Sequence, residues 1–157
     1  MDAGKLRNRA SVVLAGFLCL VALAAPGHAL GDSPGLAMLM ERMQTYTHKL
    51  QLSVEARNEG LAHFYLHELE ETAEYVAENI PHYDDYPVGP LVREMLLPRI
   101  EDVEDGVEAG EWTAADTRFA DMLRACNACH VATQHGYVRI APATGNPFAQ
   151  DFSVAED

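Results

Sequence analysis

The spacing of apolar residues along the chain predicts an all-helical protein. After residue 33, apolar positions recur every three or four residues, which is the period of one face of an α-helix. No segment alternates apolar and polar residues in the way that a half-buried strand does. The apolar stripes predict four helices, at about residues 36–58, 62–80, 90–109 and 113–130.

Individual residues mark the ends and the weak point of these helices. Pro34 suits the first turn of a helix, where the N–H that it lacks has no partner. Pro81 should stop the second helix, whereas Pro98 lies within the third and should kink or split it. Thr113 and Asp116 have the spacing of a capping box, which predicts that the fourth helix starts there.

Four amphipathic helices with mostly short connections predict an antiparallel up-down four-helix bundle. The last segment, residues 136–157, is rich in proline and glycine and shows no helical stripe. Ile140, Phe148 and Phe152 are distributed along it and can serve as apolar anchors. We therefore expect an irregular but ordered C-terminal strap over residues 136–157.

The first 29 residues are organised like a secretory signal peptide. Lys5 belongs to a basic start, Val12 to Ala25 form an apolar run of 14 residues, and small residues lead up to Ala29. That run is shorter than the roughly 20 residues needed to cross a bilayer. The sequence thus predicts cleavage after Ala29, one domain over residues 30–157, a periplasmic or secreted location, and no stable membrane span.

The predicted mature chain is strongly acidic. Residues 30–157 contain 8 Lys and Arg against 23 Asp and Glu, a formal charge of −15. Such a surface disfavours nucleic acid and anionic lipid, and it favours basic partners or cations. The acidic residues follow the polar faces of the helices, so no isolated carboxylate pair indicates a hydrolase. We do not expect an enzyme.

One short motif carries the candidate chemistry. Cys126, Cys129 and His130 form the pattern C-x-x-C-H on the predicted fourth helix. Positions i, i+3 and i+4 share one face of a helix, so both thiols and the imidazole should face the bundle interior. This pattern is typical of covalent haem c attachment, with the thiols bound to the vinyl groups and the histidine bound to the iron.

Other chemistries of a cysteine pair fit the sequence less well. A thioredoxin-like site lies between a strand and a helix, and no strand is predicted. A structural zinc site needs four ligands, and no second cysteine pair is present. The simplest alternative is a plain disulfide between Cys126 and Cys129. In that case His63 and His67 would be candidate ligands of a divalent cation in a bundle without haem.

With C-x-x-C-H near the end of its last helix, the chain resembles the cytochrome c-prime type of four-helix-bundle cytochrome. The resemblance covers about residues 33–134, and the motif is its only specific element. It implies that Cys126 and Cys129 carry one haem and that His130 is the proximal ligand. It also implies that the first helix supplies the residue over the other haem face, about where Met43 lies. Members of this family often pair through their first two helices, which is compatible with a homodimer.

Two states of the sixth iron position are compatible with the sequence. Thioether sulfur is a good ligand of haem iron, and Met43 lies on the apolar stripe of the first helix, one turn from Met40. Alternatively, both methionines only fill space in the core, and the sixth position is open.

These observations predict an exported monohaem cytochrome that carries electrons. The acidic surface should steer it toward a redox partner with a basic docking patch. The main alternative is a cytochrome with an open distal position that binds nitric oxide or carbon monoxide. His135 follows the motif closely and is a further candidate for contact with the edge of the haem.

Overall fold

The chain is helical throughout the part that the structure describes, residues 34–155 of a computed structural model. Its helices are α1 (Leu36–Glu55), α2 (Glu59–Asn79), α3 (Val88–Leu91), η1 (Val92–Leu96), α4 (Leu97–Glu108) and α5 (Trp112–Ala132). Over these residues the only strand-like feature is an isolated backbone bridge between Tyr83 and Tyr86. The predicted all-α class is confirmed for this part of the chain.

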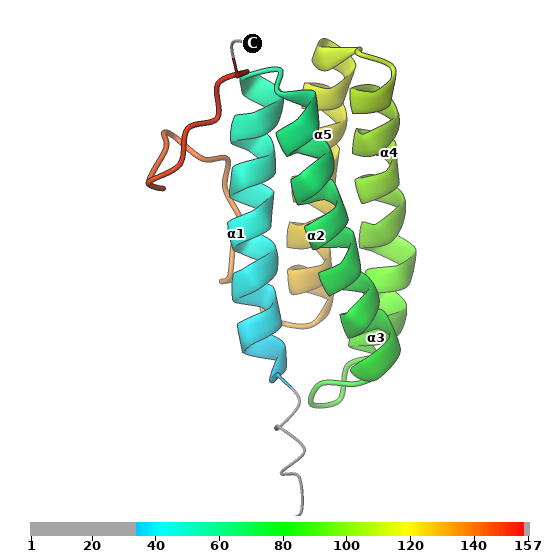
Figure 1. Ribbon diagram of the computed structural model, residues 1–157. Helices are drawn as coiled ribbons and strands as arrows, with labels where there is room; N and C mark the ends of the chain where they lie inside the picture. Colours follow the sequence, from blue (N-terminus) through cyan, green and yellow to red (C-terminus); the bar gives the residue numbers. More distant parts are fainter. Residues whose placement is uncertain (1–33, 156–157) are drawn as a thin grey trace, which may run out of the picture. The chain divides into compact units, whose positions relative to one another are not determined.

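The four long helices pack into a bundle (Figure 1). α1 packs against α2 and α5, and α4 also packs against α2 and α5, so each helix has two neighbours. The apolar stripes face inward, and the largest fully buried apolar side chains are Leu39, Leu50, Leu66, Leu69, Ile100, Met122, Val76, Val103 and Val107. Burying each of these side chains stabilises the fold by roughly 1.5–3 kcal/mol.

The third helical run is interrupted just before Pro98. α3, η1 and α4 follow one another without a break, and η1 is one turn of π-helix. Pro98, in the first turn of α4, has no N–H to donate, and in a regular α-helix its ring would clash with a carbonyl of the preceding turn. The π turn provides a wider spacing at this point. The predicted interruption at Pro98 is confirmed.

Two predicted helix ends are wrong. α1 ends at Glu55, and Asn58, which was expected to end it, instead caps α2 by accepting a hydrogen bond from the N–H of Leu61 at 3.1 Å. α5 begins at Trp112, so Thr113 lies inside its first turn and no side chain caps the helix. A residue within the helix cannot act as its N-cap, and the predicted capping box does not form.

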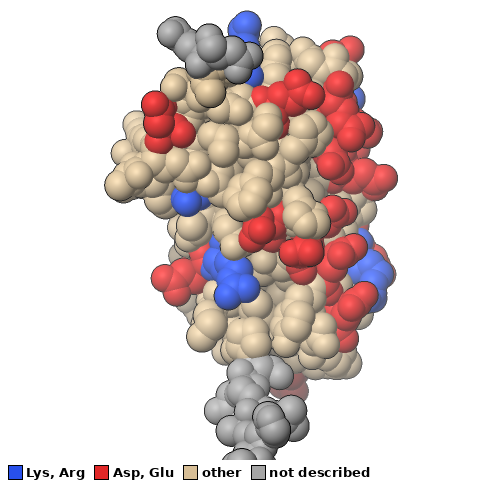
Figure 2. Space-filling view, in the orientation of Figure 1, with Lys and Arg blue, Asp and Glu red and all other residues tan. Residues whose placement is uncertain are grey.

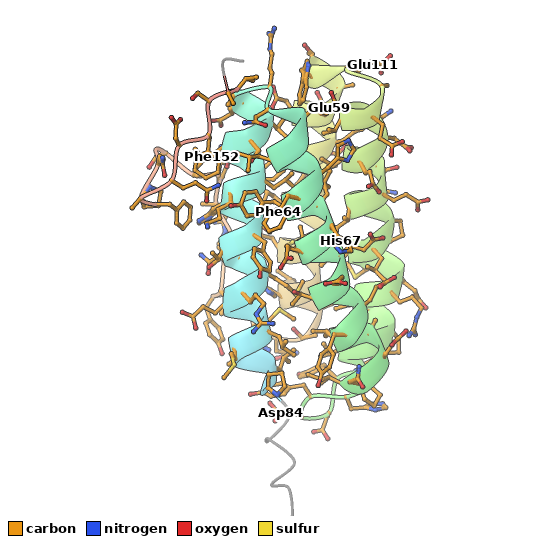
Figure 3. The ribbon with its side chains drawn as sticks, in the orientation of Figure 1. Glu59, Phe64, His67, Asp84, Glu111 and Phe152 are labelled. Carbon is orange, nitrogen blue, oxygen red and sulfur yellow. The ribbon has the colours of Figure 1, made fainter. Side chains whose placement is uncertain are left out.

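The segment after α5 is irregular and runs along α1 (Figure 1). Phe152 is buried and lies against Tyr65 of α2, with ring centroids 6.3 Å apart (Figure 3). The Oε1 atom of Gln150 accepts hydrogen bonds from the Tyr65 hydroxyl at 2.6 Å and from Lys49 Nζ at 3.1 Å. Asn58 Nδ2 donates to the carbonyl of Ser153 at 2.8 Å. These contacts hold the strap to both helices.

Within residues 34–155, no helix is long and apolar enough to cross a membrane. The predicted signal peptide, residues 1–29, lies outside the described residues, as do the last two residues of the predicted strap.

The close packing of Gly106 in α4 against Ala115 in α5 gives a prediction about stability. A Cβ atom placed on Gly106 would lie 3.0 Å from the Cα atom of Ala115, so the two helices would have to shift. Gly106→Ala should therefore lower the free energy of unfolding by about 1–3 kcal/mol, although alanine is the better helix former. Urea unfolding followed by circular dichroism measures this change.

Gly60→Ala is the matched control. Gly60 lies in the first turn of α2, where an added Cβ would meet only the side-chain oxygen of Asn58, at 3.9 Å. This replacement should leave the free energy of unfolding unchanged or raise it by up to about 1 kcal/mol. Equal losses of stability in both variants would contradict a specific clash between α4 and α5.

Candidate cofactor-binding site

An apolar cavity of about 380 Å³ lies beside the C-x-x-C-H motif. This volume is within the range of small-molecule and cofactor sites. Residues of α1, α2, α3, η1, α5, the loop before α3 and the strap line the cavity, which is partly open to the surface. Its apolar wall includes Leu36, Leu69, Val88, Val92, Leu96 and Ile140.

The structure brings the predicted site residues to this one cavity. Cys126, Cys129 and His130 lie on α5, where the i, i+3 and i+4 spacing places all three along the cavity wall. Met43 of α1 lines the same cavity and is 5 % exposed, and Met40 lines it one turn earlier. The cavity therefore combines two thiols, an imidazole and thioether sulfur in apolar surroundings.

Both cysteines are free thiols. Burial raises the pKa of Cys126 to about 11, and the neighbouring Cys129 adds to this shift. Burial also raises the pKa of Cys129 above its ordinary value. An uncharged thiol in apolar surroundings is a poor metal ligand and a slow partner in disulfide exchange, because the thiolate is the reactive form.

The ring of His130 is oriented by the strap. Its Nδ1 atom lies 2.8 Å from the carbonyl oxygen of Val138. A carbonyl can only accept a hydrogen bond, so Nδ1 carries the proton, and in the neutral form of the ring Nε2 has the free lone pair. A histidine that binds a metal through one nitrogen commonly donates the other N–H to a fixed oxygen in this way. His130 thus has the arrangement of a metal-ligating imidazole.

Two side-chain amides hold the strap near the cavity. Asn127 Nδ2 donates to the carbonyl of Ile140 at 2.9 Å, and the N–H of Ile140 donates back to Asn127 Oδ1 at 2.8 Å. Gln51 makes the same kind of pair with Ala143, at 3.2 and 2.7 Å. Asn127 belongs to α5, which carries the motif, and Gln51 belongs to α1, which carries the methionines. The strap therefore bridges these two helices.

A tight loop forms part of the cavity wall. The backbones of Tyr83 and Tyr86 pair with each other through two hydrogen bonds of 3.0 Å, and both residues line the cavity. Asp84 lies at the tip of this loop (Figure 3). The ring of His135, another lining residue, has its centroid 6.3 Å from that of Tyr83 and 5.7 Å from that of Tyr137. His135 therefore lies at the cavity, and its contact with the edge of a haem stays a prediction.

Figure 2 shows Asp and Glu concentrated over the side of the bundle formed by α2 and α4. There His63, Glu104 and Glu108 have possible ligand atoms within 4.8 Å of one another. His67 is outside this group and lies 3.5 Å from Glu71 on the exposed face of α2. The structure thus does not bring His63 and His67 together in that group.

Sequence reasoning missed the residues that position the site. The two tyrosines of the loop, the amides of Asn127 and Gln51 and the carbonyl of Val138 were not foreseen. Asn127 lies inside the motif itself, and a polar side chain between two core-facing cysteines is a signal that could have drawn attention to it. No local pattern pairs residue 51 with residue 143.

Comparisons with known proteins returned no match: no protein-family model, no curated protein and no solved structure is matched by this chain. The resemblance to the cytochrome c-prime type therefore remains a prediction. Function has to be inferred from the residues and the geometry of the cavity.

Glu70 lies on the acidic side of the bundle, and its negative charge destabilises the folded state. Burial raises its pKa, and the nearby carboxylates of Glu104 and Glu74 raise it further. A carboxyl group whose pKa is higher in the folded state destabilises the fold above that pKa, where its proton is lost. It has no such effect below the pKa of the unfolded chain.

Glu70→Gln should therefore raise the free energy of unfolding at pH 7, by less than about 1 kcal/mol because the site is partly solvated. The gain should disappear below about pH 4, where the carboxyl of the unfolded chain is also protonated. Glu71→Gln, which removes an exposed partner of His67, is the control and should give no gain. A gain for Glu70→Gln that persists at low pH would contradict the electrostatic cause.

Proposed function

We propose that this protein is an exported monohaem c-type cytochrome that carries electrons. One observation carries the proposal: Cys126, Cys129 and His130 open onto a single apolar cavity whose α1 wall contains Met43. These are the residue types that attach haem c and bind its iron. The enclosing helices also provide the apolar surface that a porphyrin requires.

The side chains fit haem c chemically. Each of the two free thiols can add across one vinyl group, the sulfur bonding to one carbon and the thiol hydrogen going to the other, so no oxidant is consumed. His130, with Nδ1 bonded to Val138, offers Nε2 as the proximal ligand. The apolar walls would limit the access of water to a bound porphyrin.

Met43 is the candidate for the sixth ligand. It is buried on α1 and lines the cavity that the motif opens onto, with Met40 one turn nearer the helix start. The bound haem would supply one-electron exchange between ferric and ferrous iron. Met43 and the apolar walls would both raise the reduction potential, because thioether ligation and burial favour the less charged ferrous state.

We also infer that the bundle is antiparallel and up-down. Three residues join α1 to α2, and three join α4 to α5. Connections of this length join antiparallel neighbours. In this arrangement the end of α5, which carries the motif, lies beside the beginning of α1, which carries Met40 and Met43.

The proposed partner is a redox protein with a basic docking patch. The acidic excess over residues 30–157 supports it, as does the concentration of Asp and Glu over α2 and α4 (Figure 2). An acidic surface also disfavours nucleic acid. The proposed location is the periplasm or the exterior, inferred from the pattern of residues 1–29. A homodimer formed through α1 and α2 is compatible with the resemblance to bundle cytochromes.

A second candidate function is the binding of nitric oxide or carbon monoxide at an open sixth position. Thr47 favours it, since this residue is 3 % exposed, lies one turn beyond Met43 and lines the cavity. The hydroxyl of Thr133, the other buried threonine at the cavity, donates to the carbonyls of Cys129 and His130. Thr47 would instead bring a hydroxyl to the α1 side, where it can donate to a bound diatomic ligand.

Expression with a cytochrome maturation system tests the proposal. The protein should retain haem on a denaturing gel, and the Cys126→Ala/Cys129→Ala variant should not, because only thioether bonds survive denaturation. The reduced protein should show low-spin bands that carbon monoxide leaves unchanged. Met43→Leu should create carbon monoxide binding, whereas Met38→Leu, at a 56 % exposed position outside the cavity, should not.

Lack of covalent haem in the unaltered protein would exclude a cytochrome and favour a disulfide between the cysteines. Haem that binds carbon monoxide without any substitution would exclude Met43 as a firm ligand and support the gas-binding function.

Electron transfer should depend on ionic strength. The rate constant for reduction of a basic c-type cytochrome should fall at least tenfold between about 10 mM and 300 mM salt, because screening weakens electrostatic steering. Stopped-flow measurements provide the rate constants, with an acidic redox protein of similar potential as the control. A rate with the basic partner that does not respond to salt would contradict docking through the acidic surface.

A further inference from the structure

Asn127 lies within the motif but acts on the strap. It is partly buried on α5 between Cys126 and Cys129. Its amide forms two hydrogen bonds with the backbone of Ile140, one donated at 2.9 Å and one accepted at 2.8 Å. Because both directions are used, the position of Ile140 relative to α5 is fixed.

The strap also meets α5 two residues before Ile140. There the carbonyl of Val138 accepts the hydrogen bond from Nδ1 of His130 at 2.8 Å. Asn127 and His130 are three residues apart on α5, so they lie about one helical turn from each other on neighbouring positions of the helix. The short segment between Val138 and Ile140 is therefore held by α5 at both ends.

We propose that Asn127 is the positioning residue that holds the Val138 carbonyl against His130 and thereby sets how strongly His130 donates to the haem iron. This inference rests on the proposed function. It assigns a role to a residue inside the attachment motif that forms no bond to haem, and it gives the strap a function beyond packing.

The physical basis is the hydrogen bond on the ligand's second nitrogen. A fixed carbonyl that accepts from Nδ1–H increases the electron density on Nε2, which makes the imidazole a stronger donor and stabilises ferric iron. Without Asn127 the segment around Ile140 loses two hydrogen bonds, and the Val138 carbonyl is no longer held in place. Nδ1–H would then bond to water, and the reduction potential should rise.

Asn127→Leu tests this inference in the haem-loaded protein, with Gln51→Leu as the matched control. Gln51 makes an equivalent reciprocal pair with Ala143, which lies three residues beyond Ile140 and five beyond Val138 along the strap. The two readouts are the reduction potential and the rate at which the His130 Nδ1 proton exchanges with solvent, measured by NMR. Asn127→Leu should raise the potential and accelerate the exchange at least tenfold. Gln51→Leu should change neither appreciably.

Asn127→Ala, which removes the same hydrogen bonds with a smaller side chain, replaces Asn127→Leu if the latter does not fold. An Asn127 variant that keeps both the potential and the exchange rate of the unaltered protein would overturn the inference. Equal changes in the Asn127 and Gln51 variants would overturn it too, because the effect would then belong to the strap as a whole. Failure of the proposed function is distinct, since the unaltered protein would then carry no covalent haem.

Discussion

The packing of α1 against α5 is the constraint on which the rest of the site depends. α5 presents both thiols and the imidazole of the motif on one face, and α1 presents its methionines and Thr47 on another. The cavity exists only while both faces are directed at the same space. A shift of one residue in either helix would rotate its face by about 100° and remove its side chains from the cavity. The remaining helices, the loop and the strap fill in the walls around this pair.

The periodic part of this arrangement could be predicted from the sequence. Apolar stripes locate the helices because burial acts on every third or fourth residue, and the same periodicity places Cys126, Cys129 and His130 on one face. Met43 was identified through the resemblance to bundle cytochromes, together with its position on the stripe of α1. Pro98 could be recognised as an interruption because the missing N–H acts locally, whatever surrounds it.

The rest depends on contacts between distant parts of the chain. Asn58 was assigned to the wrong helix because an asparagine suits either a helix end or an N-cap, and its side chain also bonds to Ser153, 95 residues away. Asn127 is similar, because its amide could have faced solvent and pairs with Ile140 only once the strap is in place. The loop tyrosines reach the cavity through a turn that the stripes do not encode. The hydrogen-bond partners of such polar side chains thus cannot be predicted from the apolar pattern, because each side chain has several possible partners.

The turn η1 sets the rotational phase of the helical run that follows it. Val88, Val92 and Leu96 line the cavity at intervals of four residues, whereas Gly106 in α4 meets Ala115 of α5. A run of residues spaced by four drifts around a regular α-helix, and the π turn absorbs that drift. Regular α-helical geometry over the same residues would advance α4 by up to one residue's rotation, about 100°, and move its acidic face toward the core. Because of this turn, the residues before Leu97 can line the cavity while α4 packs on α5.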